Sequence, residues 1–83
     1  MASRISYKAS VAGDLKRLDK PVVSRVLSKL EHTLTHNPNA GIPLTGEFSG
    51  LFKLRIGDYR AIYAKTSEGV LVLRIAHRKD VHR

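Results

Sequence analysis

The sequence predicts an α+β protein with two layers, in which two helices cover one face of a mostly antiparallel sheet. Apolar residues in the first half of the chain recur every three or four positions, as they do on one side of a helix. In the second half they alternate with polar residues, as they do in strands with one buried face. The chain has 83 residues, enough for a single domain over residues 1–83 with a thin core.

The first half contains a strand and then two helices. Arg4–Tyr7 alternates as a short strand does, and the apolar spacing that follows predicts a first helix over Ala9–Leu18. Asp19 suits the N-cap of a second helix, and Pro21 suits its first turn, where the missing N–H costs nothing. This helix is expected to end near His36, because an Asn-Pro pair follows it. Since a short segment joins the helices, we expect an antiparallel hairpin.

The second half contains a loop and then a meander of strands. Residues 37–50 include two prolines and three glycines, which predicts a loop. Residues 57–58, Gly-Asp, have the chemistry of a tight hairpin turn, and residues 66–69 form a second turn. Three antiparallel strands are expected around these turns, over Leu51–Ile56, Tyr59–Lys65 and Val70–Ala76. The expected order of elements is therefore β-α-α-β-β-β.

The composition points to a polyanionic partner and to the cytoplasm. Fifteen Lys and Arg against seven Asp and Glu give a net charge of +8, which favours RNA, DNA or an acidic protein as the partner. There is no cysteine for a disulfide or a cysteine-bound metal. The longest apolar stretch, Val70–Leu73, is far shorter than the roughly 20 residues that span a bilayer. The alternative is a basic protein whose charge only keeps it soluble.

Basic side chains are expected to gather on the open face of the sheet. Because side chains alternate along a strand, Lys53 and Arg55 point away from the face that packs on the helices. Arg60 lies just past the hairpin turn, and Arg78 follows the last strand with His77, Lys79 and His82 close by. The alternative is an ordinary solvated sheet face with surface histidines. His32 and His36 have metal-ligand spacing, but no third ligand is in sight, so we interpret them as surface residues.

This basic set suits cleavage of RNA by its own 2′-hydroxyl group. Such an enzyme must take the proton of that hydroxyl, stabilise charge on the phosphorane-like transition state, and protonate the departing 5′ oxygen. Arginine offers fixed donors to the phosphate oxygens, and histidine exchanges protons near neutral pH. The route needs no metal ion or other cofactor, and the sequence offers no carboxylate cluster to hold a metal.

Several spaced motifs resemble one family. In order, they are Leu15–Asp19, Gly41–Gly46, Gly50–Tyr63 and His77–His82. Together they resemble the RelE branch of the RelE/ParE toxin superfamily over nearly the whole chain. The resemblance implies a RelE-like fold and a metal-independent endoribonuclease that enters the ribosomal A site and cuts mRNA. It also implies a cognate acidic antitoxin that covers the site.

The resemblance also assigns roles to individual residues. Lys53 and Arg55 match basic catalytic residues, Arg60 matches the arginine on the scissile phosphate, and Arg78 matches an arginine that supports the transition state. His82 falls where many members carry a tyrosine, so the acid–base chemistry differs there. The general base stays open among Lys53, Arg55 and His82. The expected RNA-binding residues are Lys53, Arg55, Arg60, His77, Arg78 and Lys79.

Two other functions remain open at this point. Members of the superfamily that have lost the basic set tend to be inhibitors of DNA gyrase of the ParE kind, so retention of that set favours the ribonuclease. A non-catalytic module that only binds its antitoxin is the other alternative.

Overall fold

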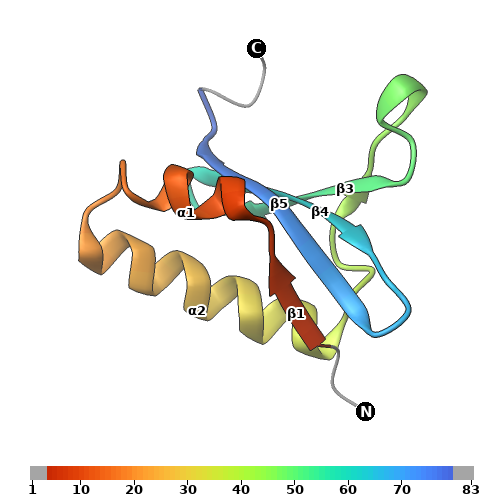
Figure 1. The fold of residues 1–83 in the computed structure, drawn as a ribbon, viewed down its shortest axis with the longest axis horizontal. Helices are drawn as coiled ribbons and strands as arrows, with labels where there is room; N and C mark the ends of the chain where they lie inside the picture. The colour runs from red at the N-terminus through yellow and green to blue at the C-terminus, as the bar shows by residue number, and fades with distance from the viewer. Residues whose placement is uncertain (1–3, 80–83) are drawn as a thin grey trace.

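The computed structural model describes residues 4–79, which form one five-stranded sheet with two helices (Figure 1). The strand order across the sheet is β1-β5-β4-β3-β2. β1 runs parallel to β5, and all other neighbours are antiparallel. The elements are β1 (Arg4–Tyr7), α1 (Ala9–Leu15), α2 (Lys20–His36), β2 (Ile42–Pro43), a 3-10 turn η1 (Gly46–Phe48), β3 (Leu51–Ile56), β4 (Tyr59–Lys65) and β5 (Gly69–His77).

The predicted α+β fold and its order of elements are confirmed. β1, β3 and β4 have the predicted bounds, and α2 ends at the predicted residue, His36. Gly57 adopts the positive φ of 60° that the tight turn between β3 and β4 requires of it. Asp19 is the N-cap residue of α2, although its side chain makes no capping hydrogen bond. None of the helices within residues 4–79 is long and apolar enough to cross a membrane.

Two segments differ from the prediction. α1 ends at Leu15 and not at Leu18. The N–H of Lys16 still bonds four residues back, but the N–H groups of Arg17 and Leu18 bond three residues back, to Asp14 and Leu15, and so form a tight turn. The predicted loop contains the short edge strand β2, which pairs with β3. Its proline is tolerated because an edge strand has one side without ladder partners.

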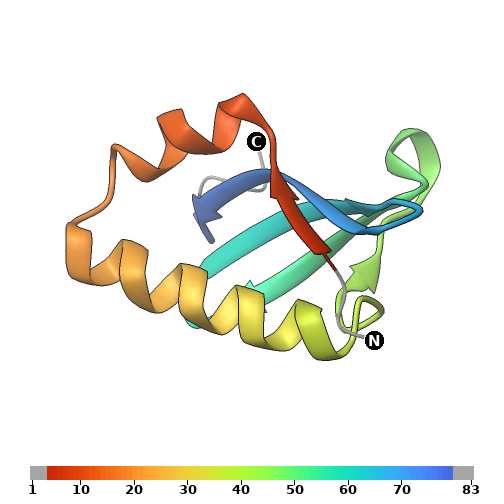
Figure 2. The ribbon, with the colours of Figure 1, turned by 60° about the horizontal axis from the view of Figure 1, so that its bottom comes forward.

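The two helices pack on different strands. α1 lies on β5, whereas α2 lies against β1 and β3. Figure 2 shows the helices splayed apart from the segment that joins them, so the predicted hairpin is an open one. The hydroxyl of Tyr7 in β1 donates a hydrogen bond to the carboxylate of Glu31 and ties that strand to α2.

The core lies between the helices and one face of the sheet. α2 contributes one stripe of buried side chains, α1 contributes Val11, and residues of the three long strands contribute the others. The opposite face of the sheet carries no helix and is called the open face below. The buried apolar residues are Val11, Val26, Leu30, Leu34, Leu54, Ile56, Ala61, Tyr63, Val70, Val72 and Ile75.

Tyr63 anchors the chain that leaves α2. Its ring is fully buried and stacks on Phe52, with 5.3 Å between the ring centroids. Its hydroxyl accepts a hydrogen bond from the N–H of Gly41 at 2.9 Å and donates one to the carbonyl of Pro38 at 2.8 Å. A Cβ atom on Gly41 would lie 2.7 Å from that hydroxyl oxygen, so the close approach requires glycine. The loop before β2 is thereby fixed to the sheet.

The substitution Tyr63→Phe is expected to lower the free energy of unfolding by about 2 kcal/mol, because it leaves the Gly41 N–H and the Pro38 carbonyl without their partner. Urea denaturation measures the loss. Tyr59→Phe is the matched control, since the Tyr59 hydroxyl makes no hydrogen bond to any other group in residues 4–79. Equal stabilities of the two variants would refute the anchoring role.

Candidate nucleic-acid interface

The strand register arranges the open face in rows that run across β3, β4 and β5. One row holds Lys53 opposite Ile62, which is opposite Arg74. The next row, two residues closer to the β3–β4 turn, holds Arg55 opposite Arg60, which is opposite Ala76. Side chains that lie directly opposite one another have Cβ atoms about 5 Å apart. The two rows therefore bring the predicted residues Lys53, Arg55 and Arg60 into one cluster.

Among the described residues, the cations of this cluster have no acidic partner. Lys53, Arg55 and Arg60 take part in no ion pair with any other residue of the segment 4–79. Arg60 is half-buried, and its Nη1 donates to the carbonyl of Tyr59 at 3.2 Å. Like charges directly opposite each other destabilise a sheet. The Arg55–Arg60 pair therefore works against stability and marks the cluster as a place for an anion.

The start of the C-terminal segment meets the same end of the sheet. The N–H of Arg78 donates to the carbonyl of Asp58 at 2.8 Å, which places the backbone of Arg78 beside the β3–β4 turn. Arg55 and Arg60 lie next to that turn, so Arg78 is close to their row. Lys79 follows and is exposed. His82 lies outside the described residues.

His77 lies on the other face of the sheet. It is paired with Tyr59, and the two rings meet edge to face with 5.4 Å between their centroids. Tyr59 packs against the core on the side of α2. His77 shares that side with Ile75, because alternate residues of a strand share a face. His77, expected among the open-face cations, therefore directs its ring toward Tyr59, although the residue also contributes to the lining of a hollow beside the cluster.

Sequence reasoning missed Arg74, which the structure places on the open face. Strict alternation from Val70 and Val72 would turn Arg74 toward the helices. A β-bulge between β4 and β5 inserts Leu73 as an extra residue, so Tyr63 pairs with Val72 while Ile62 pairs with Arg74. The bulge reverses the alternation and brings Arg74 into the row of Lys53.

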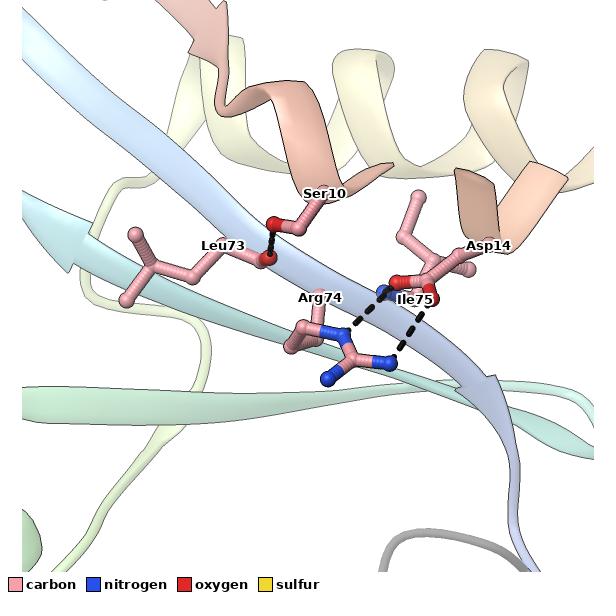
Figure 3. A network of polar contacts seen from close by, with 5 residues as sticks. All are labelled: Ser10, Asp14, Leu73, Arg74 and Ile75. Atoms are coloured by element: carbon pink, nitrogen blue, oxygen red, sulfur yellow. Dashed lines mark hydrogen bonds and ion pairs between the residues drawn. The ribbon is translucent and has the colours of Figure 1, made fainter. Parts of the chain in front are cut away.

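α1 holds Arg74 in place and covers the free edge of β5 (Figure 3). The pairing of β1 with β5 ends at Val72. Beyond this residue β5 is still paired with β4, but the backbone groups on its other edge have no strand partner within residues 4–79. The hydroxyl of Ser10 donates to the carbonyl of Leu73 at 2.7 Å, and the carboxylate of Asp14 accepts from the N–H of Ile75 at 2.9 Å. The same carboxylate accepts two hydrogen bonds from the Arg74 guanidinium, at 3.0 and 2.8 Å.

Asp14 is ionised within this network. Its burial alone would raise the pKa of the carboxyl, but the hydrogen bonds from Arg74 and from the N–H of Ile75 and the charges of Arg74 and Arg17 outweigh burial and lower the pKa below its usual value. The hydrogen bond and charge of Asp14 in turn raise the pKa of Arg74. Arg74 is thus a compensated cation, in contrast to Lys53, Arg55 and Arg60.

A hollow with a volume of about 630 Å³ lies beside the cluster. Apolar side chains of the open face line it from three strands: Leu51, Ile62, Leu73 and Ala76. Phe48 of η1 borders it at the β3 side, and Arg74 and Arg17 border it at the α1 side. Its volume falls in the range of small-molecule pockets. We call this feature the hollow below.

The histidines of α2 lie on its surface, as the sequence pattern indicates. His32 and His36 are exposed, their ring centroids lie 4.7 Å apart, and the Nδ1 of His36 is bonded to the carbonyl of His32. Within the part of the chain that the structure describes, no three potential ligand side chains come together.

The substitution Arg55→Thr is expected to raise the free energy of unfolding by about 0.5 kcal/mol, because it removes a like-charge pair and places a good strand former on an exposed strand. Urea denaturation at low salt measures the gain, which should shrink at high salt. Arg4→Thr is the matched control and should give no gain, because Arg4 of β1 is paired with Glu68 at 3.2 Å. A loss of stability in Arg55→Thr would contradict the repulsion.

Comparisons with known proteins agree with this fold. Residues 5–82 match the family described as the ParE toxin of the type II toxin–antitoxin system parDE. The chain is 32% identical to Toxin RelE of Mycobacterium tuberculosis over an aligned length of 83 residues, and the alignment covers 95% of this chain and 84% of that protein.

Solved structures give the same result. The toxin–antitoxin complex RelBE2 of Mycobacterium tuberculosis matches with a TM-score of 0.86 and 29% identity over 96% of this chain and 95% of that one. The archaeal RelE–RelB complex of Pyrococcus horikoshii shares the fold, with a TM-score of 0.72 and 23% identity over 98% of this chain and 100% of that one. The chain therefore belongs to the RelE/ParE superfamily of toxins of type II toxin–antitoxin systems.

Proposed function

We propose that this protein is a toxin that cuts mRNA on the ribosome, in the cytoplasm, and does so without a metal ion. The observation that carries the proposal is the uncompensated cluster of Lys53, Arg55 and Arg60 on the open face, with Arg78 at the same end of the sheet. Such a cluster holds phosphate oxygens and stabilises the charge that grows on them in the transition state. The likeness to Toxin RelE supports the same reading.

The proposed reaction uses the RNA as its own nucleophile. The 2′-oxygen attacks the adjacent phosphorus, the bond from phosphorus to the 5′-oxygen breaks, and the products carry a 2′,3′-cyclic phosphate and a 5′-hydroxyl. A general base takes the 2′-hydroxyl proton, and a general acid protonates the departing 5′-oxygen. Arginine stays protonated in proteins, so Lys53 and His82 are the members of the candidate set that can exchange protons. Arg60 and Arg78 would hold the phosphate oxygens.

An acidic antitoxin is the proposed protein partner. The two similar solved structures, RelBE2 and the archaeal RelE–RelB complex, each contain a RelE protein bound to its RelB partner, and the first is described as a toxin–antitoxin complex. A net charge of +8 attracts an acidic segment and speeds its association. Such a segment laid over the open face would neutralise the cluster and block the RNA.

Primer extension on a reporter mRNA tests the proposal, with purified protein in the presence and absence of programmed ribosomes. Cuts that appear only with ribosomes, persist in EDTA-treated protein and disappear when antitoxin is added are the expected result. Cuts on naked mRNA would refute ribosome dependence, and no cuts in either case would refute the nuclease.

Inhibition of DNA gyrase is the second candidate, because the family that matches residues 5–82 is described as the ParE toxin. A supercoiling assay with purified gyrase separates the two functions. Loss of supercoiling without RNA cleavage would favour gyrase, whereas we expect normal supercoiling because the phosphate-binding cluster is present.

A further inference from the structure

We propose that the hollow is a base-binding subsite, in which a nucleobase of single-stranded RNA packs between Phe48 and the guanidinium plane of Arg74. This inference rests on the proposed function and adds a place for the nucleotide beside the scissile phosphate. Phe48 and Arg74 are not members of the cation cluster, so the subsite has residues of its own.

The hollow adjoins the phosphate-binding cations through the strand register. Ile62, in the floor of the hollow, lies directly between Lys53 and Arg74 in one row. Ala76, also in the floor, lies directly opposite Arg60 in the next row. Neighbouring strands are about 4.8 Å apart. A phosphate held by Lys53 and Arg60 therefore has its own nucleotide within reach of the floor.

The two sides of the hollow offer flat surfaces of the kind on which bases stack. Phe48 is 55% exposed and borders the hollow, so about half of the residue is open to a ligand. Arg74 contributes a guanidinium whose plane is fixed by the two hydrogen bonds to Asp14. Proteins that bind single-stranded RNA stack bases on aromatic rings and on guanidinium planes of this kind.

Because Arg74 is paired with Asp14, it suits the base of a nucleotide better than the phosphate. The ion pair has no net charge, so Arg74 attracts a phosphate less than the uncompensated Arg60 does. Its nitrogen Nη1 has no part in the bonds to Asp14, and Figure 3 shows that nitrogen directed away from the carboxylate. Its N–H bonds lie in the guanidinium plane, so they can donate to a polar group at the rim while the face of the plane stays free for a base. The charged cluster thus fits the phosphate and the compensated pair fits the base.

Binding of a fluorescent RNA tests the subsite without any need for cleavage. The probe is a short single-stranded RNA with 2-aminopurine at one position and 2′-O-methyl groups throughout, so that it cannot be cut. Stacking of 2-aminopurine quenches its fluorescence. We expect quenching on the wild-type protein, and a Kd about tenfold higher with loss of quenching for Phe48→Ala.

Three further variants separate stacking from folding and charge. Phe48→Tyr keeps the aromatic face and should bind as the wild type does. Ile42→Ala is the matched control, because Ile42 is an apolar side chain that is 65% exposed and lies outside the hollow. Arg74→Lys keeps a cation beside Asp14 but removes the plane, so quenching should decrease while the unfolding midpoint stays near that of the wild type.

The outcomes distinguish this inference from the proposed function. Unchanged quenching in Phe48→Ala would overturn the subsite even if ribosome-dependent cleavage is found. Weaker antitoxin binding by Phe48→Ala with unchanged RNA binding would overturn it too, and would make the hollow a protein-binding surface. Quenching that depends on Phe48 in a protein that cuts no mRNA would support the subsite and refute the nuclease.

Discussion

The substitution Asp14→Ala is expected to lower the free energy of unfolding by about 3 kcal/mol, because it leaves the N–H of Ile75 buried without an acceptor and detaches α1 from β5. The Arg74 side chain is 60% exposed and can turn to water, so the ion pair itself contributes little of this loss. Urea denaturation at pH 7 measures the difference between the variant and the wild type.

The pH dependence of that difference identifies the carboxylate as its source. The folded protein holds the pKa of Asp14 below its usual value of 3.8, so the folded state binds this proton less readily than the unfolded state does. The stabilisation is therefore fully present above the unfolded pKa and is lost as the pH falls through the lower, folded pKa. The two proteins should differ by a constant amount from neutral pH down to about pH 5, and the difference should narrow in stronger acid as the charge of Asp14 is lost.

Asp14→Asn is the matched control. Its amide oxygen can still accept from the N–H of Ile75, but it carries no charge for Arg74. We expect a stability between those of the wild type and Asp14→Ala, with no convergence on the wild type above about pH 4. A gap between the wild type and Asp14→Ala that stays unchanged into strong acid would refute the role of the ionised carboxylate.

Much of the fold could be predicted because its signals are local. The helical spacing along α2 and the alternation along β3 and β4 each lie within one element, and the Gly-Asp turn fixes the register between the two strands. That register is also why Lys53, Arg55 and Arg60 could be placed together on one face. β2 was missed because two residues carry no readable alternation, and its pairing depends on a loop that Tyr63 holds in place.

The rest of the site depends on contacts between distant parts of the chain. Arg74 was missed because the extra residue Leu73 reverses the alternation of β5, and no local sequence signal marks a bulge there. Asp14 resembles a solvated residue of a short helix until β5 is packed against it. His77 was placed with the cations on proximity in sequence alone, whereas its pairing with Tyr59 brings the two rings together.

The substitution Arg60→Ala is expected to slow single-turnover mRNA cleavage on programmed ribosomes by about 10²–10³-fold, because it removes a fixed donor to the phosphate oxygens on which charge grows. The rate should fall without loss of the fold, since Arg60 lies directly opposite Arg55 and its removal relieves repulsion between them. Rapid-quench measurement of the cleaved reporter gives the rate, and urea denaturation of the same samples gives the stability.

Arg25→Ala is the matched control for charge. It lowers the net charge by the same amount, but Arg25 is exposed on α2, in the layer that covers the other face of the sheet. If Arg60 acted only through a general electrostatic attraction to the ribosome, both variants would be slowed equally. Lower salt would then restore both cleavage rates. Cleavage by Arg60→Ala within about threefold of the wild-type rate would exclude a transition-state role for this residue.

Arg60→Lys then tests the geometry of the contact. Lysine keeps the charge and therefore the repulsion from Arg55, but it lacks the planar fork that bonds two phosphate oxygens at once. If the fork matters, Arg60→Lys is as stable as the wild type and still cleaves far more slowly. The effects on stability and on activity would then be separated at one position. The facing arginines that destabilise the sheet would be the arrangement that phosphate binding requires.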